Sequence, residues 1–210
     1  MNIVIFGASG RTGLHLIVQA LALGHIVTAI IRRPERFRIS FDRLRVMPGD
    51  ALNEGSFGEA LVGQDAVVSA LGIAGIRNSL RPTTFHVDTA RNIMSGMRRH
   101  GVRRFVGITS VGVVHGPTTP VWYRMTLQPL LRHKYGDMQR MEAAVADSAL
   151  DWTVIRPVRL TNGPLTQHYR TDPRGTIEDG TSISRADVAD FALQQLGGSA
   201  PFNQTVAVSY

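Results

Sequence analysis

The sequence predicts an α/β fold in which helices cover both faces of a doubly wound parallel sheet. Short apolar runs alternate along the chain with segments whose apolar residues recur at helical spacing. The runs are almost wholly apolar, as expected for strands that are buried on both faces. Because no linker, repeat or low-complexity stretch interrupts the 210 residues, we expect a single domain over residues 1–210.

The first half of the chain is expected to supply four strands of this sheet. The four apolar runs, of which the third is the weakest, span residues 3–6, 26–31, 44–47 and 66–71. After the first run, apolar residues recur at helical spacing from Leu14 to Leu21, and Gly24 is a helix stop signal. Residues 54–61 are expected to form a short helix.

The second half of the chain continues the same alternation. Its apolar runs span residues 105–108, 152–155 and 205–208. Helical spacing marks residues 85–97, which end before Gly101, and residues 138–145. Ser184 followed by Asp187 resembles a capping box and predicts a helix start before Val188. We therefore expect about six or seven strands in the sheet.

Two stretches, residues 111–131 and 160–181, show no clear periodicity. Both follow strands, and right-handed crossovers place the ligand of such a sheet at the carboxyl ends of its strands. We therefore expect both stretches to be loops on the substrate side of the molecule. The first is rich in apolar residues, which suits a lid over a planar substrate or a contact between two copies of the chain. A monomer and a homodimer both remain open.

The composition excludes several classes of protein. Cysteine is absent, so disulfides and cysteine-bound metal centres are excluded, and the seven histidines lack metal-ligand spacing. No metal is therefore expected. No apolar run reaches the roughly 18 residues that a membrane helix needs. The N-terminus lacks a charged leader and a cleavage site, so we expect a cytoplasmic protein without a membrane partner.

The chain is basic, with a net charge of +7, and Lys134 is the only lysine among its 23 Lys and Arg residues. A genome biased toward arginine codons would produce the same excess. The basic residues are spread along the sequence, without a basic tail or a stripe interleaved with aromatic residues. Nucleic acid is therefore not the expected partner.

The strongest local signal is the Gly-Ala-Ser-Gly-Arg-Thr-Gly segment at residues 7–13, which follows a strand and opens a helix. Gly7 can make the tight turn, Gly10 lets the backbone approach a pyrophosphate, and Gly13 lets the helix pack closely on the sheet. The helix N-terminus offers free N–H groups to a phosphate. The predicted dinucleotide contacts are Gly7, Ser9, Gly10, Arg11, Thr12 and Gly13. The alternative is that the glycines serve turn chemistry alone.

Arginines, rather than an acidic residue, follow the second predicted strand. They are Arg32, Arg33 and Arg36. An NAD site usually places an acid here for the ribose 2′-hydroxyl, whereas arginine can bind a 2′-phosphate with two hydrogen bonds. We therefore predict NADP(H) as the cofactor, and Arg11 is a further candidate for the 2′-phosphate or the adenine. The alternative is three solvated loop arginines, and Glu35 between them weighs in its favour.

Residues at the ends of three other strands are further cofactor candidates. In strand order they are Asp50, Ala51, Leu71, Gly72, Thr109 and Ser110. Asp50 would accept a hydrogen bond from the adenine amino group or would cap the following helix, and the sequence weighs the two evenly. Gly72 would let the cofactor pass close to the backbone. Ser110 lies at the expected depth of the nicotinamide.

These segments together resemble the NAD(P)H-binding, NmrA-like group of atypical short-chain dehydrogenases/reductases, which includes biliverdin-IX-beta reductase, also called flavin reductase. The matching segments are residues 3–13, 31–33, 49–50, 63–67, 90–93, 109–110, 152–157, 163–166 and 183–188. The resemblance implies a Rossmann fold and cofactor contacts at residues 7–13, Arg32, Arg36, Asp50, Leu71, Gly72 and Ser110. It also implies that the turn at Pro157 and Val158 closes over the nicotinamide. The flavin reductase has a histidine after the corresponding proline pair, where this chain has Val158 and Arg159.

The Tyr-x-x-x-Lys pair of typical dehydrogenases of this superfamily is absent. In that pair, the lysine lowers the tyrosine pKa so that the tyrosine can move a proton. Tyr135 lies 25 residues after Ser110, at a plausible distance for the family's tyrosine, but Gln139 stands where the lysine would be. Tyr135 is a candidate general acid, or an aromatic residue packed under a loop. Ser110 is a candidate contact to the nicotinamide carboxamide or the substrate, or a helix cap.

The missing pair suits an acceptor that needs no strong enzymic acid. A flavin, a tetrapyrrole or a quinone-like molecule accepts hydride into a conjugated system, and water can supply the proton. We therefore expect an NADPH-dependent reductase of a small conjugated acceptor. The alternative is a non-enzymic, NmrA-like redox sensor. An epimerase or dehydratase is less favoured, because the lysine is missing and the region after Pro157 is short for a sugar-nucleotide subdomain.

Overall fold

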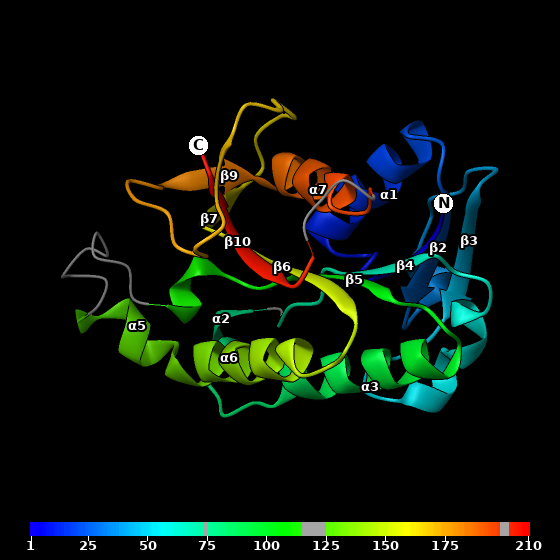
Figure 1. The fold of residues 1–210 in the computed structure, drawn as a ribbon, viewed down its shortest axis with the longest axis horizontal. Helices are drawn as coiled ribbons and strands as arrows, with labels where there is room; N and C mark the ends of the chain where they lie inside the picture. Colours follow the sequence, from blue (N-terminus) through cyan, green and yellow to red (C-terminus); the bar gives the residue numbers. More distant parts are fainter. Residues whose placement is uncertain (74, 115–124, 198–201) are drawn as a thin grey trace.

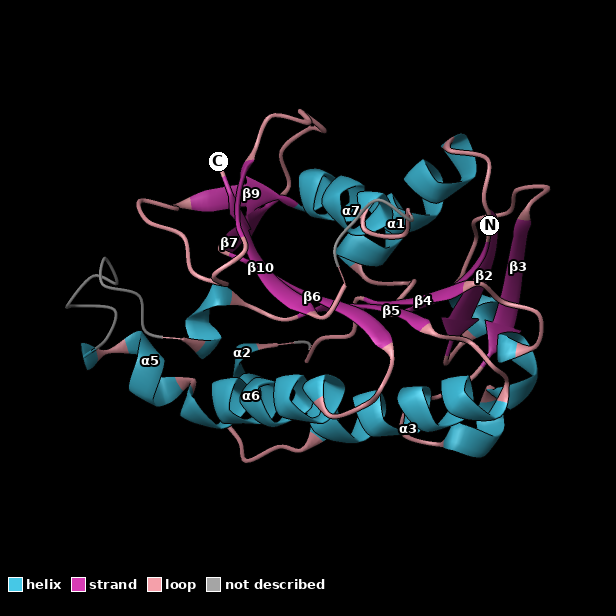
Figure 2. Ribbon diagram, viewed as in Figure 1, coloured by secondary structure: helices cyan, strands magenta, loops and turns pink. Residues whose placement is uncertain are grey.

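The computed structural model describes residues 1–73, 75–114, 125–197 and 202–210. Its centre is an eight-stranded sheet (Figures 1 and 2). From edge to edge, the strands are β3 (Leu44–Pro48), β2 (Ile26–Ile31), β1 (Asn2–Phe6), β4 (Ala66–Ser69), β5 (Arg104–Ile108), β6 (Asp151–Pro157), β10 (Gln204–Ser209) and β8 (Arg170–Asp172). Neighbouring strands run parallel except β8, which pairs antiparallel with β10. A separate pair of parallel strands consists of β7 (Arg159–Thr161) and β9 (Ser182–Ser184).

Helices cover both faces of the sheet (Figure 2), which confirms the doubly wound α/β class. The long helices α1 (Arg11–Ala22) and α7 (Arg185–Gln194) pack together on one face. On the other face, α3 (Phe85–Arg99) packs against α6 (Arg132–Ala146). The connections contain the short elements η1 (Pro34–Arg36), η2 (Glu54–Ser56), η3 (Gly58–Leu61), α2 (Ile76–Ser79), η4 (Val111–Val113) and α5 (Leu127–Leu130).

Burial on both faces explains why the strand sequences are wholly apolar. In β1, Ile3 and Ile5 pack into the core under α1 and α7, while Val4 and Phe6 pack into the core over α3 and α6. Phe6 meets Phe57 edge to face at a ring distance of 4.9 Å. Each central strand therefore stabilises two cores at once, which a half-exposed strand could not do.

The order of the strands identifies where a ligand can bind. From β1 the chain moves outward through β2 and β3, and from β4 it moves outward in the opposite direction through β5 and β6. This reversal between β1 and β4 creates a crevice outside the carboxyl ends of the strands. The glycine segment at residues 7–13 begins there, directly after β1.

Four details differ from the sequence predictions. The sheet has eight strands rather than six or seven, because β8 joins its edge. The predicted loop at residues 160–181 contains most of β7 and all of β8, and these three-residue strands are too short to show a periodicity. Residues 54–61 form the 3-10 turns η2 and η3 instead of one helix. The predicted loop at residues 111–131 includes η4 and α5, while its residues 115–124 lie outside the described residues.

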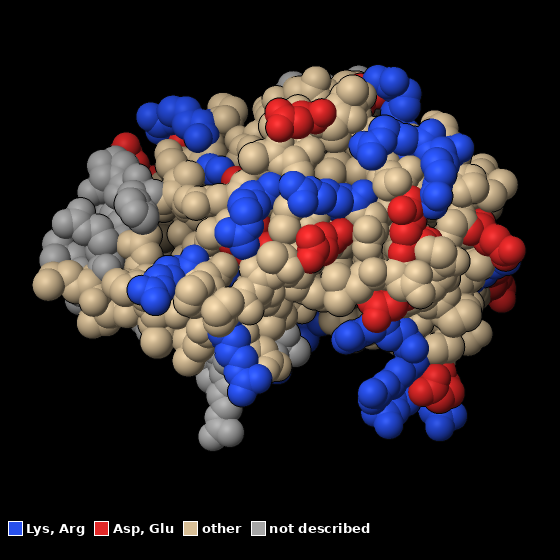
Figure 3. All heavy atoms as spheres, turned by 90° about the horizontal axis from the view of Figure 1, so that it is seen from below, with Lys and Arg blue, Asp and Glu red and all other residues tan. Residues whose placement is uncertain are grey.

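The face that Figure 3 shows carries its positive charge in a dispersed form. Seen from below, Figure 3 shows Lys and Arg side chains spread over the face that α3 and α6 form, with Asp and Glu among them. Within the four described ranges, no helix is long and apolar enough to cross a bilayer.

Candidate cofactor-binding site

The glycine segment after β1 forms a tight turn that leads directly into α1. Gly7 has a φ of +77°, and a Cβ atom there would lie 2.6 Å from the Ala70 carbonyl oxygen. A Cβ on Gly13 would lie 2.2 Å from the Gly7 carbonyl oxygen, so only glycine allows α1 to pack this closely on the turn. The N-cap residue of α1 is Gly10, which has no side chain to cap the helix. The first N–H groups of α1 are thus left available to an anion.

Two adjoining pockets open at this turn and at the carboxyl ends of β2, β3 and β4. A pocket of about 580 Å³ is lined by Ser9, Ile31, Arg32, Arg33, Arg36, Phe37 and Asp50. A pocket of about 300 Å³ is lined by Phe6, Gly7, Ser9, Gly10, Ile30, Ile31, Arg32, Gly49, Asp50, Ala51, Ala70, Leu71, Gly72 and Phe85. They share four lining residues, so together they form one continuous groove across the strand ends.

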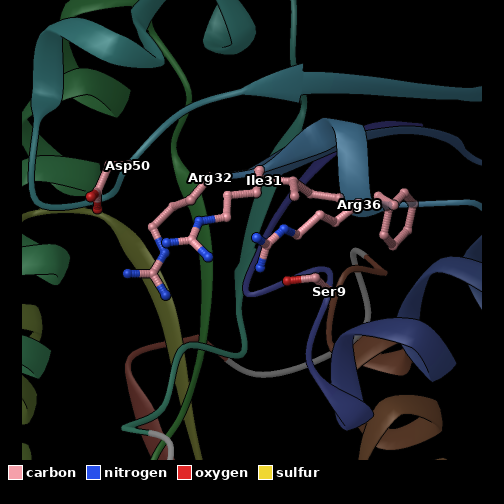
Figure 4. Close-up of a pocket in the computed structure, with 7 residues that line it drawn as sticks. Ser9, Ile31, Arg32, Arg36 and Asp50 are labelled. Carbon is pink, nitrogen blue, oxygen red and sulfur yellow. The ribbon is translucent and has the colours of Figure 1, made fainter.

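The larger pocket is strongly cationic. Arg32 and Arg33 follow β2, Arg36 ends η1, and all three side chains are exposed. Figure 4 shows Arg36 directed toward Ser9 of the glycine turn. Among the ion pairs found in the described ranges, none engages these three arginines. The pocket therefore presents unpaired guanidinium groups beside a helix N-terminus, an arrangement that suits phosphate.

Asp50 lines both pockets, and its side chain also caps the turn that follows β3. Its Oδ1 atom accepts a hydrogen bond from the Leu52 N–H at 3.0 Å, and Ser56 Oγ accepts one from the Asp50 N–H at 2.8 Å. The capping alternative from the sequence is thus present in the structure. The cap leaves Asp50 on the wall of the groove, so the two roles are compatible.

The groove gathers ten of the predicted cofactor residues and leaves seven away from its walls. The lining residues among them are Gly7, Ser9, Gly10, Arg32, Arg33, Arg36, Asp50, Ala51, Leu71 and Gly72. The predicted residues that do not line it are Arg11, Thr12, Gly13, Thr109, Ser110, Pro157 and Val158. Gly13 has the packing role described above, and Val158 is buried, with its N–H donating to the Val208 carbonyl at 3.3 Å.

Phe37 and Phe85 are lining residues that the sequence alone did not single out. Phe37 follows η1 on the wall of the cationic pocket and packs partly against the core. Phe85 begins α3 and faces the smaller pocket with Leu71 and Gly72. Both lie outside the glycine and arginine motifs. Only the pairing of strands and helices brings them to the groove.

The candidate catalytic residues lie together at the end of β5. Ser110 Oγ accepts a hydrogen bond from the Gly112 N–H at 3.3 Å and so caps η4. The Tyr135 ring packs against Gly112, where an added Cβ atom would lie 2.4 Å from the ring. Gln139, at the position of the missing lysine, donates from Nε2 to the Val113 carbonyl at 2.7 Å. The capping and packing alternatives are therefore realised, and they also bring Tyr135 next to the Ser110 loop.

A buried histidine–aspartate pair joins the starts of the two helices on this side. Asp137 of α6 accepts hydrogen bonds from the His86 N–H at 2.7 Å and from His86 Nδ1 at 2.9 Å. It therefore caps α3 just after Phe85. Burial lowers the pKa of His86, although the hydrogen bond to Asp137 opposes this shift. The pair holds Phe85 in place at the groove.

The predicted capping box at α7 is present and also anchors the segment of residues 160–181. Ser184 Oγ accepts a hydrogen bond from the Asp187 N–H at 2.9 Å. The buried Asp187 carboxylate accepts hydrogen bonds from the backbone of Thr166 and Gln167, each at 2.8 Å, and from the Tyr210 hydroxyl at 2.6 Å. Burial alone would raise the pKa of Asp187, but these hydrogen bonds, that of Tyr210 foremost, outweigh it and hold the pKa below its ordinary value.

Comparison with known proteins identifies the family to which the chain belongs. The model of the NAD(P)H-binding family matches residues 7–198, so the chain belongs to that family. A chloroplast protein of Arabidopsis thaliana is 28% identical over 205 residues, which cover 93% of this chain and 71% of that protein. The chain is thus a member of the NAD(P)H-binding family, and solved structures share its Rossmann fold.

Several solved structures share this fold over nearly the whole chain. A short-chain dehydrogenase/reductase from Veillonella parvula, solved with NADP, aligns with a TM-score of 0.82 at 19% identity and covers 100% of this chain and 94% of that chain. A candidate NADH-flavin reductase from Streptococcus pneumoniae aligns with a TM-score of 0.76 at 19% identity and covers 100% of this chain and 99% of that chain. At these identities the likeness establishes the fold.

Proposed function

We propose that the protein is an NADPH-dependent reductase that transfers hydride to a small conjugated acceptor such as a flavin, a tetrapyrrole or a quinone-like molecule. The observation that carries the proposal is the groove itself. It joins a helix N-terminus without a side-chain cap to a pocket lined by three arginines that form no ion pair within the described part of the chain. A cofactor with a pyrophosphate and a 2′-phosphate matches both ends of this groove.

The groove suggests how NADPH lies across the strand ends. The pyrophosphate would lie over the turn of residues 7–13, and the 2′-phosphate would lie between Ser9 and the arginine side chains. The adenine would lie toward Asp50 and Ala51. The nicotinamide would extend past Leu71, Gly72 and Phe85 toward Thr109 and Ser110. In this proposal the turn at Pro157 and Val158 closes the nicotinamide end.

The chain's own residues would contribute mainly position and a dry environment. When bound, NADPH supplies a hydride, which carries both electrons to the acceptor. The acceptor's conjugated system takes up the negative charge, and a proton from water or from the Tyr135 hydroxyl completes its reduction. Gln139 cannot assist Tyr135 as a lysine would, because it is neutral and donates to the Val113 carbonyl at 2.7 Å. In this proposal Tyr135 would therefore donate a proton only as a weak general acid.

Anaerobic oxidation of NADPH in the presence of FMN, riboflavin, biliverdin or a simple quinone tests the proposal. Saturable loss of the reduced nicotinamide absorbance with any one of them supports a reductase and identifies the class of acceptor. Tight NADPH binding without turnover on the whole panel contradicts the reductase proposal. That outcome would favour the NmrA-like sensor, whose occupancy by cofactor would be read by a protein partner.

A further inference from the structure

A buried ion pair between α6 and β6 contacts Thr109, which follows β5 toward the proposed nicotinamide end of the groove. Glu142 of α6 and Arg156 of β6 face each other with side chains that are only 10% and 12% exposed. Arg156 Nε donates to Glu142 Oε1 at 3.1 Å, and Arg156 Nη2 donates to Glu142 Oε2 at 2.5 Å. The contact is therefore a bidentate pair of charge-assisted hydrogen bonds, which fixes both side chains in direction as well as distance.

This ion pair also holds two segments that belong to the ligand edge. The Thr109 hydroxyl donates to Glu142 Oε1 at 2.6 Å, and Thr109 immediately precedes Ser110. Arg156 Nη1 donates to the Gly175 carbonyl at 3.1 Å, in the turn that follows β8. Arg156 itself immediately precedes the predicted nicotinamide contacts Pro157 and Val158. The ion pair thus connects the end of β5, the end of β6 and the segment of residues 160–181.

Stability alone is a weak explanation for such a pair. Taking two charges out of water costs about as much free energy as their attraction returns, and apolar side chains of similar volume often stabilise a core equally well. An apolar pair, however, could not accept the hydrogen bond that the Thr109 hydroxyl donates to Glu142. The arrangement therefore gives directional control over the backbone at Thr109, where the peptide N–H also donates to the Ile155 carbonyl at 2.8 Å.

We propose that Glu142 is a positioning residue, which acts through Thr109 to fix the Ser110 hydroxyl at the nicotinamide end of the groove. Ser110 Oγ accepts from the Gly112 N–H, so its own proton remains available for the carboxamide of the nicotinamide or for the acceptor. This inference rests on the proposed function. It adds that productive placement of the nicotinamide depends on a carboxylate that contacts neither cofactor nor acceptor.

Substitution of Thr109 separates positioning from bulk stability. Thr109→Val keeps the side-chain shape and removes the hydroxyl, with its 2.6 Å hydrogen bond to Glu142 and its longer 3.5 Å contact with the Ile155 carbonyl, whereas Thr109→Ser keeps both. We expect Thr109→Val to lower kcat for NADPH oxidation by roughly tenfold to a hundredfold, the range that a small misplacement of reacting groups costs. The dissociation constant of NADPH should change less than about threefold, because the adenosine and pyrophosphate contacts are untouched. Thr109→Ser should restore kcat.

A double variant tests whether the charge pair matters beyond the stability of the fold. Glu142→Met alone leaves the Arg156 charge buried and should lower the melting temperature. Adding Arg156→Met removes that charge and should recover the melting temperature. If Glu142 positions Thr109, the double variant stays as slow as Thr109→Val even though its stability has recovered. Recovery of kcat together with stability would overturn the inference, as would an unchanged kcat in Thr109→Val.

A binding signal keeps this test independent of turnover. The fluorescence of bound NADPH reports the surroundings of the nicotinamide, and it can be measured without an acceptor. We expect Thr109→Val and the double variant to lose the emission change that the wild-type chain produces, while Thr109→Ser retains it. If no acceptor is reduced by the wild-type chain, the proposed function fails and this emission decides the inference alone. Identical emission in all variants would overturn it.

Discussion

At the scale of single residues, the site depends on which charges lack a partner. Arginine is common in this chain, so the presence of arginines near a strand end means little by itself. Arg103 and Arg174, for example, are paired with Asp151 and Asp172 on the surface. Arg32 and Arg36 differ because they line a pocket beside the helix N-terminus and have no carboxylate partner among the described ion pairs.

The double variant Arg32→Ala with Arg36→Ala should discriminate between the two nicotinamide cofactors. A charge-assisted hydrogen bond contributes about 1.5–3 kcal/mol, so we expect NADPH affinity to fall by at least roughly tenfold for each arginine. NADH affinity should change little, since NADH lacks the 2′-phosphate. Titration calorimetry with both cofactors measures the difference. Arg38→Ala is the matched control, because Arg38 is exposed on the same connection and does not line the pocket. Equal losses for NADPH and NADH would refute the assignment of the 2′-phosphate.

Gly10→Val tests the proposed pyrophosphate position. The backbone of Gly10 has φ −77° and ψ 164°, which valine can adopt, and an added Cβ atom would lie 3.1 Å from the Gly7 carbonyl oxygen, so we expect a cooperative fold of somewhat lower stability. The branched side chain would occupy the space in front of the first N–H groups of α1. We expect both NADPH and NADH to bind more weakly by roughly a hundredfold, while urea unfolding remains a single cooperative transition. Unchanged affinity for both cofactors in the folded variant would show that the phosphates bind elsewhere.

At the scale of elements, the long, regular strands and helices could be predicted from the sequence, whereas the three-residue strands and the contacts between distant segments could not. The central strands were predictable because burial on both faces makes them wholly apolar. The three-residue strands β7, β8 and β9 carry no such pattern, and their pairing depends on partners far along the chain. The same limit hid Glu142, because its contact with Thr109 spans 33 residues and Glu142 itself belongs to no motif. The glycine turn was predictable because its chemistry is local.

The anchor of residues 160–181 on α7 predicts a dependence of stability on pH. Because folding lowers the pKa of Asp187, its ionised carboxylate stabilises the fold above the ordinary aspartate pKa of about 3.9. That contribution is lost as the pH falls through the lower pKa of the folded state. Asp187→Asn should therefore cost roughly 2–4 kcal/mol at neutral pH and make the acid dependence of stability shallower.

Urea denaturation at neutral and at acid pH measures both effects of Asp187→Asn. The exposed Asp42 supplies the control, since Asp42→Asn alters a carboxylate of the same type outside this network. An acid dependence in Asp187→Asn as steep as that of the wild-type chain would show that the stabilisation arises elsewhere.

At the scale of the whole molecule, fold class and family could be predicted from the order and spacing of motifs alone. The family match over residues 7–198 confirms that the chain is built throughout on the NAD(P)H-binding plan. The groove's walls could be predicted only in part. The glycine turn and the arginines were visible in the sequence, whereas Phe37 and Phe85 reach the groove through the packing of η1 and α3. Membership of the NAD(P)H-binding family does not identify the hydride acceptor.

The most direct test of the central claim is the affinity of the wild-type chain for NADPH and for NADH, measured by titration calorimetry at one ionic strength. The unpaired arginines predict that NADPH binds more tightly by on the order of a hundredfold. The preference should shrink as salt is added, because the arginines are exposed and their charges are screened. Equal affinity for the two cofactors would contradict the account, since the cationic pocket would then bind something other than the 2′-phosphate.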